Sequence, residues 1–206
     1  MQVQLERNRY RPEEYLDLER KAEYKSEYIN GFIFAMAGAS KEHNQITLNI
    51  ASEIHHQLKG RPCFVYSNDM RVRIVETGMY AYPDIVATCS SPKFEDSYVD
   101  TLLNPMLIIE VLSDSTEAYD RGQKFAHYRR LASLTDYVLV AQDRACVEHY
   151  VRRSEQWILT EVSGLEGTIQ FESISCVLLL AEIYDKVELP QDKKACLVWP
   201  NSVADR

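Results

Sequence analysis

Two acidic residues accompany stretches of sequence that have the pattern of buried strands. Asp84 opens an apolar run at residues 85–87, and Glu110 lies within a second run at residues 107–112. Runs of Val, Ile and Leu bounded by Pro or Ser are typical of buried strands, where carboxylates are rare unless their charge is compensated. Two carboxylates ~4 Å apart at an effective dielectric constant of ~20 repel each other by about 4 kcal/mol. The sequence therefore predicts that one acid is protonated or that a cation lies between the two.

A hard divalent metal ion is the cation that such a pair favours. No cluster of His or Cys accompanies Asp84 and Glu110, and ligands that are all oxygens suit Mg²⁺ or Mn²⁺. A metal held by two acids can polarise a phosphorus centre and activate the attacking water, which is the chemistry of phosphodiester hydrolysis. The plainer interpretation of Asp84 is that its carboxylate caps a turn after Pro83.

A helix is expected to follow the second acidic strand, over about residues 120–131. The Ser and Thr cluster at 113–116 is a signal for helix entry, and Asp120, Lys124 and Tyr128 recur every four residues, which places them on one helical face. The four-carbon stem of the lysine is long enough to reach back to the strand end. The plainer interpretation is an exposed i, i+4 ion pair between Asp120 and Lys124, worth ~0.3–0.5 kcal/mol.

The order and spacing of these residues resemble the PD-(D/E)xK nuclease superfamily and, within it, the Uma-two family of restriction endonucleases. The resemblance covers residues 12–180. The residues that carry it are Pro83, Asp84, Glu110, Asp120, Lys124 and Tyr128.

The resemblance implies an α/β fold with a restriction-endonuclease-like mixed central sheet flanked by helices. It also implies a metal-dependent endonuclease that hydrolyses phosphodiester bonds in DNA with Mg²⁺ or Mn²⁺. Asp84, Glu110 and Lys124 are then the catalytic residues. The alternative is a catalytically inactive module on the same fold, which binds nucleic acid or a protein partner.

One departure from the superfamily pattern concerns the lysine. Its usual place is two residues after the second acid, where this chain has Leu112. The resemblance implies that the lysine has moved onto the following helix, as Lys124. There it would orient or deprotonate the water or stabilise the charge on phosphorus, and Tyr128 would position it.

Auxiliary site residues come from the N-terminal third of the chain and from the same helix. Glu27 precedes an Asn-Gly hairpin turn and is expected to join the two strand acids as a metal ligand or to hold a second metal. His43 lies in the first turn of a helix expected at residues 40–58, where the resemblance places a His near the site. Asp120 is expected to assist beside the lysine.

Arg71 and Arg73 are candidates for holding a substrate phosphate. They alternate with Val72 and Ile74 in a strand expected at residues 70–76. Such alternation predicts a half-exposed strand with the arginines on its outer face.

The composition is typical of a single globular domain. The chain has 206 residues, of which 46% are hydrophobic and 26% charged, which suits one nuclease-like domain at residues 1–190 and a tail at residues 191–206. No apolar run approaches ~18 residues and the N-terminus lacks a signal-peptide core, so we expect a cytoplasmic protein with no membrane partner. The net charge of −8 argues against non-specific coating of nucleic acid but is compatible with a local DNA site.

Cysteines and the tail complete the expectations. The five cysteines are scattered, with no Cys-x-x-Cys pair, so we expect reduced thiols and neither a disulfide framework nor a zinc site. The apolar tail segment Leu197-Val198-Trp199, together with the family resemblance, suggests a homodimer.

Overall fold

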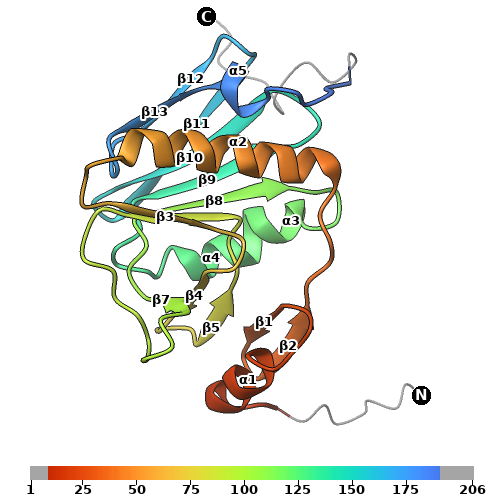
Figure 1. Cartoon of the computed structure of the whole chain (residues 1–206), viewed down its shortest axis with the longest axis vertical. Helices are drawn as coiled ribbons and strands as arrows, with labels where there is room; N and C mark the ends of the chain where they lie inside the picture. The colour runs from red at the N-terminus through yellow and green to blue at the C-terminus, as the bar shows by residue number, and fades with distance from the viewer. Residues whose placement is uncertain (1–8, 191–206) are drawn as a thin grey trace, which may run out of the picture.

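Residues 9–190, the part of the chain that the computed structural model describes, form three sheets with helices packed around them (Figure 1). The helical segments are α1 (Pro12–Glu19), α2 (Lys41–Leu58), α3 (Glu117–Tyr119), the π-helical η1 (Asp120–Lys124), α4 (Phe125–Tyr128) and α5 (Leu180–Ile183). The strands are β1 (Ser26–Ile29), β2 (Phe32–Ala35), β3 (Phe64–Ser67), β4 (Arg71–Ile74), β5 (Met79–Ala81), β6 (Ile85–Thr88), β7 (Thr101–Leu102), β8 (Leu107–Leu112), β9 (Asp136–Ala141), β10 (Cys146–Arg153), β11 (Gln156–Ser163), β12 (Thr168–Phe171) and β13 (Cys176–Leu179).

The central sheet is mixed. Its six strands lie in the order β11-β10-β9-β8-β6-β3, and β8 pairs with β9 in parallel but with β6 in antiparallel. The register sets Ile85 of β6 opposite Ile109 of β8. Asp84, which directly precedes β6, and Glu110, within β8, therefore lie on neighbouring strands. This confirms the predicted α/β fold with a mixed central sheet flanked by helices.

The two faces of β8 are buried under different layers. Because successive strand residues point to opposite faces, Ile109 and Val111 lie in the hydrophobic cluster that includes the α2 residues Ile46, Ile50 and Ile54. Ile108 and Leu112 lie in a second cluster, with Tyr128 of α4. Glu110 shares the parity of Ile108 and Leu112, so its carboxylate is delivered to the α4 side of the sheet.

Helix α2 forms as predicted. The Ser40 side chain caps it by accepting a hydrogen bond from the His43 amide (3.0 Å), which satisfies one of the free N–H groups of the first turn. The predicted helix over residues 120–131 differs from expectation, because a π turn interrupts it and it ends at Tyr128. Helix α1 ends at Glu19.

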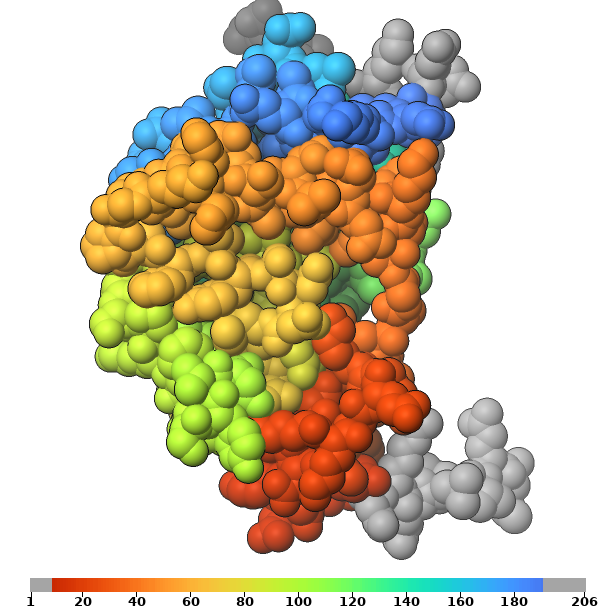
Figure 2. Space-filling view, viewed as in Figure 1, coloured from red at the N-terminus to blue at the C-terminus, as the bar shows by residue number. Residues whose placement is uncertain are grey.

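A smaller sheet carries the N-terminal hairpin. Its strand order is β2-β1-β5-β4-β7, and the β1-β2 turn uses Asn30 and Gly31 at positive φ, as the Asn-Gly signal predicts. Residues 9–35 lie against the segment around residues 90–104 (Figure 2). Arg20, at the end of α1, binds Asp96 and Asp100 of that segment (2.7 and 2.9 Å).

The exposed position expected for Arg71 is wrong, whereas Arg73 is partly exposed. Arg71 is only 3% exposed. Its guanidinium lies 2.6 Å from the Asp100 carboxylate and also donates hydrogen bonds to Tyr82 and Thr101. Arg73 pairs with Glu95. Alternation in β4 failed to predict this because the segment before Leu102 folds over the strand and supplies carboxylates on the side expected to face water.

The structure bears on the helices of residues 9–190 but not on the C-terminal tail. Within residues 9–190, no helix is long and apolar enough to cross a bilayer. The tail segment Leu197-Val198-Trp199, on which the homodimer expectation rests, lies outside the described residues.

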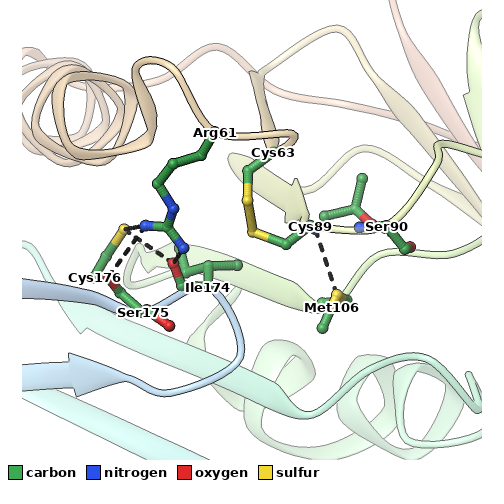
Figure 3. The surroundings of a disulfide bond; sticks show 9 residues. Arg61, Cys63, Cys89, Ser90, Met106, Ile174, Ser175 and Cys176 are labelled. Carbon is green, nitrogen blue, oxygen red and sulfur yellow. Dashed lines mark hydrogen bonds between the residues drawn. A yellow bond between two sulfur atoms is a disulfide. The ribbon is translucent and has the colours of Figure 1, made fainter.

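The expectation of reduced thiols is wrong for Cys63 and Cys89. Cys63 and Cys89 form a disulfide that joins the ends of β3 and β6 (Figure 3). These positions continue the antiparallel register that sets Phe64 opposite Thr88, so the fold brings together two cysteines that are separated by 26 residues in sequence. Scattered spacing gave no signal for the pairing because it arises from strand register.

We expect the disulfide to stabilise the domain. A crosslink over a loop of 26 residues restricts the unfolded chain and is worth about 3 kcal/mol. Urea unfolding should therefore show a reductant-sensitive midpoint in the parent protein, and Cys63→Ser with Cys89→Ser should lower the midpoint in the absence of reductant and make it less sensitive to reductant. Cys176→Ser is the matched control, since Cys176 is a buried free thiol and its loss should leave the effect of reductant in place. Alkylation of both Cys63 and Cys89 in the unreduced, unfolded protein would contradict the pairing.

Candidate active site

A buried ammonium group is the centre of the candidate site. The Lys124 Nζ atom lies 2.9 Å from Glu110 Oε1, 3.2 Å from Glu27 Oε1 and 3.6 Å from Asp120 Oδ1. Lys124 is 6% exposed, and all three acids are buried as well. The interpretation of Asp120 and Lys124 as an exposed helical pair is therefore excluded.

Three separate elements deliver these side chains. Glu110 comes from the middle of the central sheet on β8, Glu27 from β1 of the smaller sheet, and Asp120 and Lys124 from η1. The π turn therefore lies at the point where the two sheets meet the helical layer. Such π-helical turns are rare and occur frequently at functional sites.

Asp84 borders this cluster and is tied to the strand of Glu110. Its Oδ2 atom accepts a hydrogen bond from the Val111 amide at 2.7 Å and lies 3.2 Å from His43 Nε2. The carboxylate therefore bonds to the neighbouring strand and to the first turn of α2. This geometry goes beyond the simple turn cap that the Pro-Asp pair allows.

Two tyrosine hydroxyls donate hydrogen bonds to acids of the cluster. The Tyr128 hydroxyl donates to Glu110 Oε1 (3.0 Å), as expected of a residue that shares its helical face with Lys124. The Tyr119 hydroxyl donates to Glu27 Oε2 (3.3 Å), a contact that the sequence did not predict. Tyr119 and Lys124, which both contact Glu27, are five residues apart. Such residues lie on one helical face where the helix takes the wider i→i+5 turn, and Gly122 in mid-helix was the one hint of such a turn in the sequence.

The cluster holds more negative charge than its lysine neutralises. Burial raises the pKa of the Glu110 carboxyl well above its usual range, and Asp120 and Asp84 act in the same direction while Lys124 opposes them. Burial also raises the pKa of Asp120. For Lys124, burial works to lower the pKa, but Glu110 and the other nearby groups hold it well above its usual range. An isolated ion pair would lower the pKa of its acid, so the rise at Glu110 means that burial and the extra carboxylates outweigh one ammonium.

The donor set suits a hard cation by its chemistry. The acids offer only oxygen ligands, as Mg²⁺ and Mn²⁺ prefer, and the excess of negative charge favours uptake of a cation. The buried Glu27 Oε1 atom makes no hydrogen bond, although it lies 3.2 Å from Lys124 Nζ. As the side chains stand, no three His, Cys, Asp or Glu side chains in the described part of the chain are arranged to bind a metal. Carboxylates that now face Lys124 would have to turn toward the ion.

The structure thus brings most of the predicted site residues together. Glu27, Glu110, Asp120, Lys124 and Tyr128 are in mutual contact, and Asp84 and His43 lie beside them. The two arginines predicted to hold phosphate pair with acids outside this cluster, Arg71 with Asp100 and Arg73 with Glu95.

Comparisons with known proteins agree with one another. The sequence model of the Uma2 family, described as "Putative restriction endonuclease", matches residues 12–180. Two uncharacterised proteins of Synechocystis sp., sll1609 and slr1290, are 40% and 34% identical to this chain, covering 77% and 84% of it and 90% of each relative. The crystal structure of a "putative nuclease belonging to DUF820" from Anabaena variabilis superposes with a TM-score of 0.71 at 20% identity, covering 87% of this chain and 99% of that one. This last likeness establishes the fold.

We expect Glu110→Gln to preserve or raise stability at neutral pH in the absence of metal. A pKa that is higher in the native than in the unfolded state means that the native state binds more protons, so the stability contributed by Glu110 falls as pH rises through that interval. Glutamine removes this loss, while Glu27 and Asp120 still compensate Lys124. Thermal unfolding should therefore show the variant to be at least as stable as the parent at pH 7, and the unfolding temperatures of the two proteins should converge as the pH falls toward 4.

The matched control for that measurement is Glu148→Gln. Glu148 is another buried acid, bound to Arg121 at 2.5 Å, and removing one partner of a buried pair is destabilising. A fall in the unfolding temperature at pH 7 that is as large for Glu110→Gln as for Glu148→Gln would contradict the excess of negative charge.

Proposed function

We propose that this chain, which belongs to the Uma2 family, is a metal-dependent endonuclease that hydrolyses phosphodiester bonds in DNA. The observation that carries the proposal is the convergence of Glu27, Glu110 and Asp120 on the buried Lys124 ammonium. Burial of so many charged groups costs folding free energy. Buried charged groups of this kind are typical of functional sites. The family description and the fold of the DUF820 structure support a nuclease.

Asp84, Glu110 and Glu27 are the residues that we propose to hold Mg²⁺ or Mn²⁺. When bound, the ion supplies Lewis-acid charge at the phosphoryl oxygen and lowers the pKa of the attacking water. His43 lies 3.2 Å from the Asp84 carboxylate and limits the directions in which that carboxylate can turn.

Lys124 acts in this proposal as a fixed positive charge. Its neighbours hold its pKa well above the usual range as the side chains stand, which favours the role of a positive charge over that of a base. Hydrolysis forms a bond from the water oxygen to phosphorus and breaks the bond from phosphorus to the leaving oxygen, which takes up a proton. An ammonium beside the phosphoryl group stabilises the charge that accumulates between these events. Tyr128 positions the lysine indirectly, because it donates to the Glu110 oxygen that Lys124 also contacts.

A second candidate function is a non-catalytic module that binds nucleic acid or a protein partner. The observation that favours it is that Lys124 now engages the carboxylates and, within residues 9–190, no side chains are arranged to bind a metal. In such a module the lysine would be a permanent counterion. Metal titration separates the two functions.

Metal binding is the first test. Isothermal titration calorimetry should show binding of Mg²⁺ or Mn²⁺ to the parent protein. Asp84→Asn and Glu110→Gln should each weaken metal affinity by about 100-fold or more, because mutation of a residue that only orients a metal ligand already costs about 10- to 100-fold. Glu148→Gln should bind metal as the parent does, because Glu148 pairs with Arg121 outside the cluster. Absence of metal binding by the parent protein would favour the non-catalytic module, and parent-like affinity in both ligand variants would contradict the assigned metal site.

Cleavage is the second test. Lys124→Met keeps the length of the side chain and removes its charge, so we expect cleavage to fall by at least about 100-fold, as when one group that stabilises transition-state charge is lost. Plasmid, linear and single-stranded DNA with Mg²⁺ or Mn²⁺ provide the assay, and calorimetry should show that metal still binds. The control is Lys186→Met, which removes an exposed lysine and should cleave at the parent rate. Parent-like cleavage by Lys124→Met would show that Lys124 is only a structural counterion.

A further inference from the structure

A tyrosine of the central sheet anchors the π turn from below. The Tyr137 hydroxyl, on β9, donates a hydrogen bond to the Asp120 carbonyl oxygen at 2.9 Å. Tyr137 is 0% exposed, so no water replaces this bond if it is lost. Its acceptor is the first residue of η1, where the chain leaves the α-helical pattern.

The π turn needs such an anchor because its backbone geometry is unfavourable. A π turn adds one residue to a helical turn, and each residue of an α-helix corresponds to a rotation of about 100°. If η1 relaxed to an α-helix, the residues before it would rotate relative to α4 by about that angle. Asp120 and Tyr119 would then lose their orientation toward Lys124 and Glu27.

The direction of the Tyr137 hydroxyl is set by packing. Its ring stacks on Phe125, the first residue of α4, with centroids 4.8 Å apart and planes 4° from parallel. It also packs against Tyr128, at 5.6 Å. One side chain of the sheet therefore contacts both ends of the segment that contains Lys124, with a hydrogen bond at Asp120 and ring contacts at Phe125 and Tyr128.

We propose that Tyr137 is a positioning residue for the nuclease reaction, acting through the backbone of η1 to hold Lys124 and Asp120 against Glu110. Its hydroxyl bonds to a backbone carbonyl and not to the carboxylate of a proposed metal ligand. The inference deepens the proposed function and rests on it for its kinetic consequence, whereas its structural consequence can be measured without any cleavage.

Tyr137→Phe tests the assignment because it keeps the ring and removes the hydroxyl. Hydrogen–deuterium exchange of the parent and variant should show faster exchange of the amides at residues 117–125, by about fivefold, as expected when one buried hydrogen bond is lost. In the cleavage assay kcat should fall about 10- to 100-fold, since displacement of a catalytic group by about 1 Å has this effect. KM should stay near the parent value, because the surface that binds DNA is unchanged.

Two control variants separate the hydroxyl from general packing. Tyr184→Phe removes another buried phenol that donates to backbone carbonyls, those of Ala141 and Cys146, and should change neither exchange at residues 117–125 nor kcat. Phe125→Leu loosens the ring stack that directs the hydroxyl but leaves the hydroxyl itself present, so it should lower kcat by less than Tyr137→Phe does.

The results decide whether Tyr137 acts through its hydroxyl bond to η1 or only through the packing of its ring. Parent-like exchange in Tyr137→Phe, or equal losses of kcat in Tyr137→Phe and Phe125→Leu, would overturn the assignment. If the parent protein cleaves no DNA, the proposed function fails, and the exchange experiment still decides whether Tyr137 holds the π turn.

Discussion

The ion pairing of Lys124 with carboxylates from two sheets and a helix is the interaction on which the rest of the structure depends. A buried ammonium is tolerated only when acids surround it, and buried acids only when a cation compensates them. Each element that carries one of these groups is therefore fixed relative to the others. The central sheet supplies Glu110, the smaller sheet supplies Glu27, and the helical layer between them supplies the cation.

The smaller sheet is held in place by a second set of charges. Arg20 and Arg71 both bind Asp100, and these partners hold the pKa of the Asp100 carboxyl well below its usual range. Glu19 completes the arrangement, because Tyr82 donates to it while also binding Arg71. These contacts join α1, β4 and the segment before β7, so the position of Glu27 depends on charge pairs that lie outside the site itself.

Much of the fold and site follows from local sequence patterns. The acids at Asp84 and Glu110 stand out because apolar strands surround them, and the four-residue spacing of Asp120, Lys124 and Tyr128 predicts a shared helical face. What local patterns could not predict depends on contacts between distant segments. The burial of Arg71 requires Asp100, which pairing of β4 with β7 brings to it, and the disulfide requires the register of β3 and β6. The π turn is equally hidden, because its cause lies in tertiary contacts and not in propensity.

The assembly of the site from distant segments has a consequence for synthesis of the protein. Chains grow from the N-terminus at roughly 5 to 20 residues per second, so Glu27 leaves the ribosome several seconds before Lys124 and Tyr137. Until then the nascent chain holds acids without their ammonium, and like charges that are brought close together repel one another. The ammonium comes with η1, and β9, which pairs with β8 in the central sheet, follows it in the chain. A growing polypeptide therefore stays without the complete cluster and the sheet that carries it until about two thirds of the chain has been made.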